Sequence, residues 1–452
     1  MLPRDGVLKH TLLYDVRQMP ESSLQSSRPQ SRREDALAVV KRLRDAGHIA
    51  YFAGGCVRDL LLGLEAKDYD VATDAPPDRV RKLFNNTQAV GAAFGVILVR
   101  LGGSQIEVAT FRADMEYEDG RRPVGVRFTS AEEDARRRDF TINGLFLDPI
   151  EDRIIDYVGG QEDLKKGVLR AIGKPEERFH EDHLRLLRAV RFAARFSLQI
   201  EEQTAKAIEH HAPHLTRISP ERIAEELRLM LTPTTRIAAW EMLWTLKLLP
   251  VILRTLPERV EKRVLQWSIF SAVAPSQPIS FPLALAATVI CYRLHASENH
   301  SVIQMLTPVA IKQDVHVCRV ALRISNDEQE HMHQVLDLWP LLQLAVPSVA
   351  LMKRFLAKPF SGDARKLLEA LHHCHYFPRS IEWLLARFAE LERTNIAPPP
   401  LITGDDLTAA GLQPGRLFKR ILDEVYDAQL EDRIATKEDA ISMAMRIARP
   451  AP

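Results

Sequence analysis

The hydrophobic pattern of this chain changes near residue 160. Before that point, short apolar segments typical of β-strands alternate with helical segments, whereas afterwards one amphipathic helical pattern follows another to the end. No strand pattern of comparable strength occurs in the second part, and no internal repeat of fixed period is present. The sequence therefore predicts an α+β fold, with an N-terminal head built on a mixed sheet and an elongated all-helical remainder.

Local composition divides the chain further. The stretch 19–33, "MPESSLQSSRPQSRR", is rich in Ser, Gln, Pro and Arg and nearly free of large apolar residues, as flexible linkers are. We therefore expect a flexible N-terminal extension followed by a head and by a helical neck, body and tail. The expected boundaries are 1–33, 34–160, 161–245, 246–400 and 401–452.

Charge and cysteine content exclude several classes of protein. A formal net charge of +1 on 452 residues gives no overall basic field, so a nucleic-acid partner would need a local patch. No apolar run approaches the ~20 residues that span a bilayer, and the first 20 residues do not resemble a signal peptide. We expect a cytoplasmic protein without a membrane partner. Four scattered cysteines form no CxxC pair and are expected to be reduced thiols in or near cores: Cys56, Cys291, Cys318 and Cys374.

Histidine-rich stretches occur in the second part of the chain. "EHMHQ" (330–334) and "LHHCHYF" (371–377) lack the Cys/His spacing of a zinc site. We interpret these histidines as surface or core residues.

Two acids stand one residue apart in "KDYDVATD" (67–74), which has the pattern of a strand. Alternation sends Asp68 and Asp70 to one face, while Tyr69 and Val71 point into a core. Like charges this close repel unless a cation lies between them, and Mg²⁺ takes one or two carboxylates together with substrate phosphates. Glu107, in the strand pattern "IEVAT", is the natural third acid. The alternative is that all three are solvated surface acids.

A glycine pair precedes the acids in "YFAGGCVRDLLLG" (51–63), which predicts a strand, Gly54-Gly55 and a helix. Glycines let the backbone approach a ligand, and a helix start offers amides to phosphates. Arg58 lies in the first turn of that helix. The alternative is a tight connection that needs glycine only for its geometry.

Arginines gather in two later segments. In "RRRDFTING" (136–144) a charged run leads directly into the strand-like "FTINGLFL", which carries charged groups inward, where an arginine requires a phosphate or a carboxylate. In "EDHLRLLRAVRFAAR" (181–195) four arginines fall within an arc of about 120° on one helix. Their mutual repulsion favours an anionic partner, although a solvated surface is the alternative.

Asp182 precedes Arg185 by one helical turn and so places one acceptor beside several donors. Adenine and cytosine both present an amino donor beside a ring-nitrogen acceptor, whereas guanine and uracil present the reverse order. Such a pair would accept A and C and reject G and U. Protein side chains would then replace a nucleic-acid template.

Four motifs together carry a family resemblance. "GGCVRDLLLG", "DYD", "RRDFTIN" and "EDHLR" resemble, in order and spacing, the class II nucleotidyltransferases, the group of the tRNA CCA-adding enzymes and bacterial poly(A) polymerases. The resemblance covers about residues 50–230. It implies a polymerase β-like head and template-independent addition of CCA to tRNA 3′ ends from CTP and ATP, with Mg²⁺ as cofactor and pyrophosphate as product.

The resemblance also implies roles for individual residues. Asp68 and Asp70 match the metal ligands, with Glu107 as the added catalytic acid. The nucleotide-binding residues that it implies are Gly55 and Arg58, then Arg138, Asp139 and Asn143 for ribose and phosphate, Asp182 and Arg185 for the base, and Arg188 and Arg191.

Three further stretches separate the members of this group. Residues 116–134 resemble the flexible loop associated with adding the terminal A, and 402–422 resemble the C-terminal segment of many CCA-adding enzymes. "IGKPEERFHED" (172–182) instead resembles a segment of bacterial poly(A) polymerases. A phosphohydrolase His–Asp pair found in some relatives is missing near 283–295. Poly(A) polymerase, a CC-only or A-only enzyme and a non-catalytic tRNA-binding protein remain alternatives, and no protein partner is implied.

Overall fold

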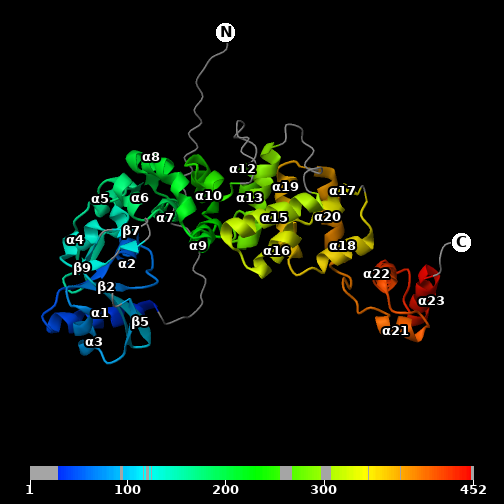
Figure 1. Cartoon of the computed structure of the whole chain (residues 1–452), viewed down its shortest axis with the longest axis horizontal. Helices are drawn as coiled ribbons and strands as arrows, with labels where there is room; N and C mark the ends of the chain where they lie inside the picture. The colour runs from blue at the N-terminus through cyan, green and yellow to red at the C-terminus, as the bar shows by residue number, and fades with distance from the viewer. Residues whose placement is uncertain are drawn as a thin grey trace, which may run out of the picture. The chain divides into compact units, whose positions relative to one another are not determined.

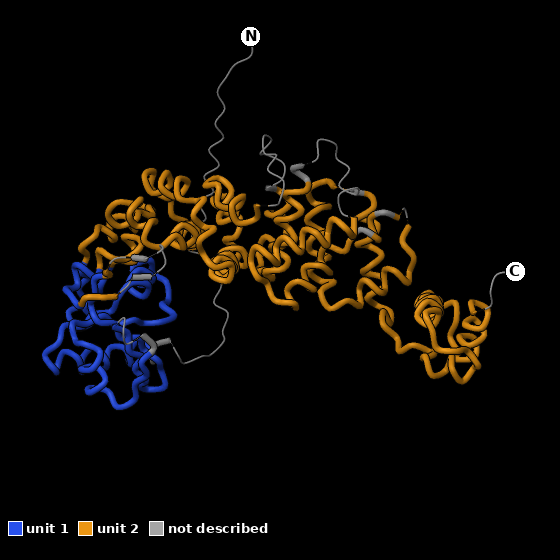
Figure 2. The backbone as a smooth tube through the Cα atoms, viewed as in Figure 1, with its two compact units in different colours: residues 1–113, 128–134, 145–155 blue, residues 114–127, 135–144, 156–452 orange. Residues whose placement is uncertain are grey.

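The computed structural model describes residues 29–91, 95–115, 117–118, 122–123, 125–254, 267–296, 307–344, 346–376 and 378–448. Two compact units are interleaved along the chain (Figure 2). The first unit consists of 1–113, 128–134 and 145–155, and the second of 114–127, 135–144 and 156–452.

A seven-stranded mixed sheet forms the first unit (Figure 1). Its strands lie in the order β11-β10-β1-β2-β5-β4-β3. The pair β2–β5 is parallel, whereas β1–β10, β1–β2, β4–β5 and β3–β4 are antiparallel. This confirms the mixed sheet predicted for the head. In sheet order the bounds are Arg153–Asp156, Leu145–Asp148, Ala50–Ala53, Asp70–Thr73, Ser104–Thr110, Val96–Leu101 and Thr87–Gly91.

Three helices of the first unit pack against this sheet: α1 (Pro29–Asp45), α2 (Gly55–Leu61) and α3 (Pro77–Leu83). The helix predicted after Gly54-Gly55 is therefore present. Helix α1 begins at Pro29, so residues 29–33 at the end of the expected linker are helical, whereas the rest of the expected N-terminal extension lies outside the described residues. Proline suits the first turn of a helix because its missing N–H would have no partner there.

The hairpin between β4 and β5 fixes the register of the sheet. Leu101 pairs with Ser104, so Gly102 and Gly103 form a two-residue turn with φ of +57° and +91°. A Cβ at Gly102 would lie 1.9 Å from Oδ1 of Asp35 in α1. Glycine is required there for the backbone angle and for the close approach of α1.

The second unit is predominantly helical, as predicted. One core extends through its residues from Phe140 to Leu391, and a smaller core joins residues from Ile402 to Ala444. The smaller core belongs to α21 (Gly404–Ala409), α22 (Arg416–Leu430) and α23 (Lys437–Ala448), drawn orange to red in Figure 1. One two-stranded parallel sheet, β12 (Val168–Leu169) with β13 (Gln199–Ile200), departs from the all-helical expectation. Strands of two residues are too short to produce an alternating pattern.

The remaining helices of the second unit are α5 (Gly160–Lys166), α6 (Pro175–Glu181), α7 (Arg185–Phe196), α8 (Glu202–His211), η3 (Ala212–Arg217), α9 (Pro220–Leu231), α10 (Arg236–Thr245), α11 (Leu248–Ile252), α12 (Trp267–Ala272), α13 (Phe281–Ala296), α15 (Pro308–Leu322), α16 (Asn326–Leu336), α17 (Trp339–Gln343), α18 (Val349–Leu356), α19 (Ser361–His373) and α20 (Pro378–Leu391).

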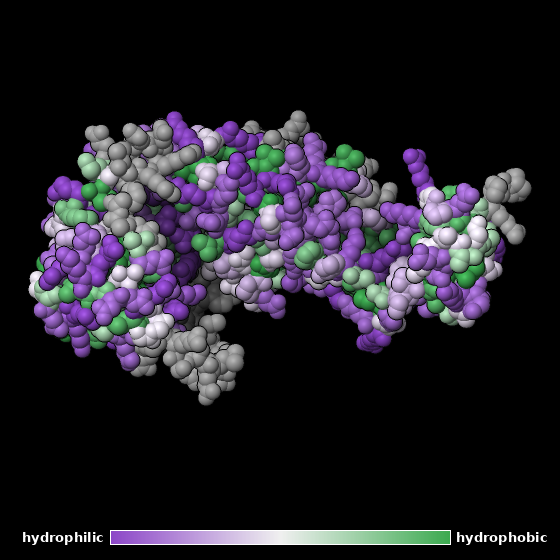
Figure 3. Space-filling model, turned by 60° about the horizontal axis from the view of Figure 1, so that its bottom comes forward, coloured by the Kyte–Doolittle hydropathy of each residue, from purple (hydrophilic) through white to green (hydrophobic). Residues whose placement is uncertain are grey.

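The hydropathy of the surface and the burial of the cysteines are those of an ordinary globular protein. On the face shown in Figure 3, hydrophobic residues are scattered among hydrophilic ones. Within the described residues, no helix is long and apolar enough to cross a membrane. All four cysteines are free thiols; three are buried and Cys374 is partly exposed, as predicted.

Candidate active site

Two predicted acids lie side by side on the sheet of the first unit. Strand β2 runs parallel to β5 with Val71 opposite Val108. The preceding residue of each strand, Asp70 and Glu107, therefore lies on the other face of the sheet. Both acids are exposed, whereas Val71 and Val108 are buried. The register thus brings the third acid of the prediction beside Asp70.

Asp68 lies just before this strand rather than within it. Strand β2 begins at Asp70, although the predicted alternation still holds, because Tyr69 and Val71 are buried while both acids are exposed. The side chain of Asp68 is 83% exposed and lies 3.4 Å from Nη1 of Arg32 in α1. Asp68 is therefore carried by irregular backbone, which ties it less firmly to the sheet than Asp70.

The turn at Gly54-Gly55 lies beside Asp70. Ala53, the last residue of β1, pairs with Asp70, and Gly54 follows with φ +67° and ψ −117°, angles that favour glycine. Its N–H donates to the carbonyl of Leu145 in β10 (2.9 Å). Burial, reinforced by the charge of Asp70, raises the pKa of the Cys56 thiol in α2 to about 12. The start of α2 therefore lies close to Asp70.

The contacts of the predicted ligands Gly55 and Arg58 are with residues close to them in the sequence. The left-handed position is Gly54, whereas a Cβ at Gly55 would meet only Nη2 of Arg58, at an ordinary 3.6 Å. Arg58 is 4% exposed, and its Nε and Nη2 donate to Oδ1 of Asp59 at 2.9 and 2.6 Å. A nucleotide contact from Arg58 would have to compete with Asp59.

The three acids fit a hard divalent cation. They offer only carboxylate oxygens, all exposed, and two of them are neighbours in adjacent strands. Oxygen ligands of this kind are those preferred by Mg²⁺, which keeps part of its shell for water and substrate phosphates.

In the second unit, Asp139 is a buried carboxylate with several donors. Its Oδ1 accepts from the Phe140 N–H (2.8 Å) and from Nδ2 of Asn143 (3.0 Å). Its Oδ2 accepts from Nε of Arg188 (2.9 Å). Burial alone would raise the pKa of this carboxyl, but the Arg188 charge and the Asn143 hydrogen bond overcome it and lower the pKa to about 2. Asp139 is therefore ionised and joins Arg188 to the 139–143 segment.

That segment is not the strand predicted from "FTINGLFL". Thr141–Asn143 form a 3-10 helix, and β10 begins only at Leu145. Asn143 is turned toward Asp139, and Oγ1 of Thr141 donates to Oδ2 of Asp163 in α5 (2.7 Å). These side-chain hydrogen bonds stabilise a tight turn in place of the ladder.

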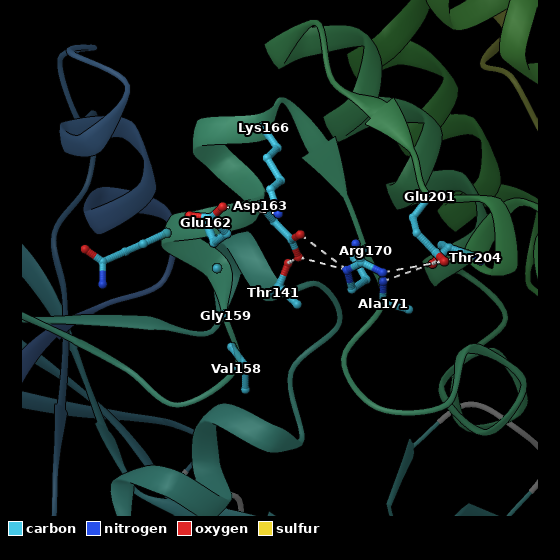
Figure 4. A network of polar contacts seen from close by, with 12 residues as sticks. Thr141, Val158, Gly159, Glu162, Asp163, Lys166, Arg170, Ala171, Glu201 and Thr204 are labelled. Atoms are coloured by element: carbon cyan, nitrogen blue, oxygen red, sulfur yellow. Dashed lines mark hydrogen bonds and ion pairs between the residues drawn. The ribbon is translucent and has the colours of Figure 1, made fainter.

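A polar network continues from Thr141 across the second unit (Figure 4). Nε of Arg170 donates to Oδ2 of Asp163 (3.1 Å), and Nη1 of Arg170 lies 3.5 Å from Oε1 of Glu201. Oε2 of Glu201 accepts from the N–H and the hydroxyl of Thr204 in α8, both at 2.8 Å. The network fixes the 139–143 segment relative to α5 and α8.

The arginines of α7 find anionic partners inside the protein. Three of them pair with carboxylates outside α7: Arg185 with Glu181 (2.5 Å), Arg188 with Asp139 (2.7 Å) and Arg191 with Glu226 (2.7 Å). Arg195 is exposed and lies over the ring of Phe196. Carboxylates of the protein itself are therefore the anionic partners of three of these four arginines.

Asp182 does not lie on the same helix as Arg185. Helix α6 ends at Glu181 and α7 begins at Arg185, so Asp182 occupies the turn between them with extended backbone angles. Its Oδ1 accepts from the Leu184 N–H (3.0 Å), and its Oδ2 lies 3.4 Å from Nη2 of Arg222. Nη1 of Arg185 also donates to the Arg178 carbonyl (3.0 Å). The two predicted base-reading groups are thus near in sequence but separately engaged.

Other predicted ligands and the loop are placed as follows. Nη1 of Arg138 donates to the Asn143 carbonyl (3.1 Å). In the 116–134 stretch, Tyr117–Glu118 pairs with Arg122–Pro123 as a two-stranded ladder, while 116, 119–121 and 124 lie outside the described residues. The structure thus carries the predicted site residues in two sets, the acids with Gly55 and Arg58 in the first unit and the remainder in the second.

Comparison with protein families matches two regions of the chain. Residues 50–170 match the poly A polymerase head domain, and 197–259 match a probable RNA- and SrmB-binding region of polymerase A. Asp68, Asp70, Glu107 and the segment around Asp139 lie inside the first matched region, and α8 and α9 lie inside the second. Asp182, Arg185, Arg188 and Arg191 lie between the two regions.

Curated relatives resemble the chain over part of their length. Poly(A) polymerase I of Salmonella typhi is 48% identical over 204 residues, covering 43% of this chain and 44% of the relative. The CCA-adding enzyme of Lactobacillus helveticus is 45% identical over 205 residues, covering 45% of this chain and 51% of the relative. The chain thus spans about half the length of the curated relatives it matches.

Solved structures resemble the chain over most of its length. The CCA-adding enzyme of Bacillus stearothermophilus, solved in complex with CTP, has a TM-score of 0.69 at 26% identity and covers 93% of this chain and 98% of its own. The Thermotoga maritima enzyme, complexed with tRNA, shares the fold at 19% identity with a TM-score of 0.62. The nucleotidyltransferase head followed by a helical part is therefore the fold of CCA-adding enzymes.

Proposed function

We propose that this chain is an RNA nucleotidyltransferase that adds CCA to the 3′ end of tRNA from CTP and ATP, releasing pyrophosphate. One observation carries this choice: the match to the Bacillus stearothermophilus CCA-adding enzyme covers 93% of this chain, including most of its helical part. The sequence matches do not separate the two functions, because those to poly(A) polymerase I and to the CCA-adding enzyme of Lactobacillus helveticus cover 43% and 45% of the chain. With tRNA as substrate, the enzyme would act in the cytoplasm.

In the first unit, Asp68 and Asp70 would hold Mg²⁺, with Glu107 beside Asp70. When bound, the ion would neutralise charge on the triphosphate and stabilise the charge that develops during nucleotidyl transfer. The glycine turn after β1 leaves the backbone accessible beside Asp70, which suits a phosphate close to the acids. Arg58 would contact the nucleotide after exchanging its partner Asp59.

In the second unit, Asp182 would accept from the amino group of A or C while Arg185 donates to the ring nitrogen. Arg188 and Arg191, together with Arg138 and Asn143, would contact ribose and phosphate, with Asp139 holding Arg188 in place. The helical neck, body and tail would bind tRNA.

The experiment that tests this function uses three tRNA transcripts, ending before the first C, after CC and after CCA. Each is incubated with Mg²⁺ and labelled CTP or ATP. A CCA-adding enzyme extends the first by CCA, the second by A alone and the third not at all. Extension that stops at CC, or that occurs only on the second transcript, would assign a split activity instead.

A matched pair of variants tests the catalytic acids and the non-catalytic alternative. Asp70→Asn should lose nearly all incorporation while keeping tRNA affinity, because the carboxylate beside Glu107 is removed without a change of shape. Glu65→Gln removes another exposed acid from the loop before Asp68 and should leave incorporation unchanged. Equal incorporation by wild type and Asp70→Asn would remove Asp70 from the chemistry, and no incorporation by wild type would favour an RNA-binding protein.

Poly(A) addition is the second candidate. The 48% identity to poly(A) polymerase I and the segment 172–182, which contains α6, favour it. An unstructured RNA ending in A separates the two functions, because only a poly(A) polymerase would add a long A tract to it.

A further inference from the structure

Three histidines meet in the second unit at the ends of three elements. His183 lies in the turn between α6 and α7, His211 is the last residue of α8, and His214 lies in η3. One ring nitrogen from each can be chosen so that all three lie within 4.8 Å of one another. His211 and His214 follow His183 by 28 and 31 residues in the sequence, and the fold brings the three side chains together.

His183 packs against the rings of His211 and His214. The side chain is 0% exposed, and neither of its ring nitrogens makes a hydrogen bond within the described residues. Buried polar groups are normally bonded, because an unmet donor or acceptor loses its hydration without compensation. A metal ion would supply the missing bond.

The spacing of the other two imidazoles fits a tetrahedral metal. A metal–nitrogen bond of about 2.0–2.1 Å at a tetrahedral angle puts neighbouring nitrogens about 3.3–3.4 Å apart. Nδ1 of His211 and Nδ1 of His214 lie 3.3 Å apart. A direct His211–His214 hydrogen bond would also give this distance, but it would leave His183 unsatisfied.

The protonation states also suit metal binding. Burial, reinforced by the neighbouring histidines, lowers the pKa of His211 to about 4. Burial also lowers the pKa of His183, although an interaction with the Phe179 backbone opposes it, and burial lowers the pKa of His214 as well. Neutral imidazoles are the form that binds metals.

The groups around the cluster restrict which ion fits. His180, His210 and Arg217 are the nearby groups that affect these pKa values, and none of them is a carboxylate. A site of three imidazole nitrogens suits Zn²⁺, Co²⁺ or Ni²⁺, whereas Mg²⁺ prefers oxygen ligands.

We propose that His183, His211 and His214 bind one divalent transition-metal ion of the zinc class, separate from the Mg²⁺ expected at the acids of the first unit. The partly exposed His214 gives the ion access from solvent and leaves a fourth position for water. A bound ion would join the α6–α7 turn to the end of α8 and to η3. That turn also holds Asp182, so the ion would fix the backbone next to a predicted base-reading residue.

The test measures Co²⁺ and Zn²⁺ binding to metal-stripped full-length protein. Asp70→Asn is used as the background, so that binding at the acids of the first unit does not obscure the result. We expect one equivalent of Co²⁺ to give the intense visible absorption of tetrahedral coordination, and Zn²⁺ to displace it. Zn²⁺ should raise the Tm, whereas Mg²⁺ should not.

Two variants added to this background locate the site. His214→Ala removes a partly exposed ligand and should weaken Co²⁺ binding at least roughly tenfold and abolish the Tm rise. His210→Ala is the matched control. His210 is the exposed neighbour of His211 and lies outside the cluster, so this variant should bind Co²⁺ like the parent.

Unchanged Co²⁺ affinity in His214→Ala, or an equal loss in His210→Ala, would overturn the proposal. His211→Ala replaces His214→Ala if circular dichroism shows that the latter is unfolded. If neither folds, the Co²⁺ spectrum of the parent decides, and a spectrum without tetrahedral absorption rejects the site.

Discussion

Asp139 connects the 140–143 turn to α7 through its buried carboxylate. Its carboxylate is buried and receives hydrogen bonds from the 140–143 turn and from Arg188 of α7. Its charged form is favoured so strongly that its pKa is about 2, below the ordinary value of 3.8. The residue was predicted as a nucleotide contact, and the structure adds a positioning role toward Arg188.

This shift predicts a pH-dependent stability difference. A carboxyl whose pKa is lower in the folded state stabilises fully above its unfolded pKa of about 3.9 and loses that contribution as pH falls toward about 2. Asp139→Asn should therefore cost about 2 kcal/mol at pH 7, and the difference from wild type should shrink below about pH 4. Urea unfolding followed by tryptophan fluorescence measures it, since all tryptophans lie in the second unit: Trp240, Trp244, Trp267, Trp339 and Trp383. A difference independent of pH would contradict an ionised Asp139.

A second residue-scale prediction concerns base selection by Asp182. Uracil or guanine would leave two polar groups of the site unmet at about 1–3 kcal/mol each, which gives discrimination of roughly a hundredfold. Asp182→Ala should compress the preference for ATP and CTP over UTP and GTP, measured by single-nucleotide incorporation from each triphosphate. Arg222→Ala is the control, because it removes only the ion pair at Oδ2 of Asp182. An equal loss of rate for all four nucleotides would assign Asp182 to the fold.

At the scale of elements, α7 packs against its neighbours and forms ion pairs with them. Its buried face belongs to the large core, while successive arginines reach the end of α6, the 139–143 segment and α9. The pair of Arg191 with Glu226 is well buried on both sides, and burial lowers the pKa of Arg191 despite the attraction of Glu226. Ion pairs of this kind hold the orientation of α7 relative to α9.

Removing one partner of that pair should destabilise the second unit. Glu226→Gln leaves the Arg191 charge buried without its counter-ion, which costs about 3–5 kcal/mol for such pairs. The double variant Arg191→Met/Glu226→Gln should recover much of the loss, because no unpaired charge remains. Glu225→Gln, its exposed neighbour in α9, is the matched control and should change the urea midpoint little. A double variant no more stable than Glu226→Gln would refute this account.

For the molecule as a whole, the helices after residue 400 form a separate small core attached through a few polar contacts. Arg354 of α18 donates to Oδ1 of Asp427 (2.6 Å) and lies 3.6 Å from Oδ1 of Asp423 in α22. Leu407, Ile421 and other core residues of the tail are absent from the larger core. This segment was predicted to bind tRNA.

Truncation after residue 400 should therefore leave the larger core folded and weaken tRNA binding. The larger core should stay folded because the tail carries its own apolar core. All five tryptophans precede the tail, so their fluorescence reports on the larger core. Tryptophan-monitored unfolding and tRNA affinity test the two parts separately. An unchanged tRNA affinity would remove the tail from RNA binding, and loss of the main unfolding transition would show that its core is not independent.

The sequence by itself determined those features that depend on neighbours along the chain. Alternation predicted that Tyr69 and Val71 point into the core and that Asp68 and Asp70 lie on the other face, and 3.6-residue periodicity predicted the helices after residue 160. Each of these signals is local, because backbone geometry sets the side-chain period within a few residues.

Only the tertiary structure decided which distant residues meet. Arg188 pairs with Asp139 across 49 positions and Arg191 with Glu226 across 35, so the charges of these two arginines are offset by acids that no local pattern connects to them. The same holds for His183, which meets His211 and His214 only through packing. One local departure has the same origin, because the 3-10 helix Thr141–Asn143 is held by the hydrogen bond from Thr141 to Asp163 in α5. The turn at Asp182 differs, since its side chain accepts from the N–H of Leu184, only two residues away. Side-chain bonds to distant elements outweigh the small free-energy differences between local conformations, and these bonds exist only once the chain has folded.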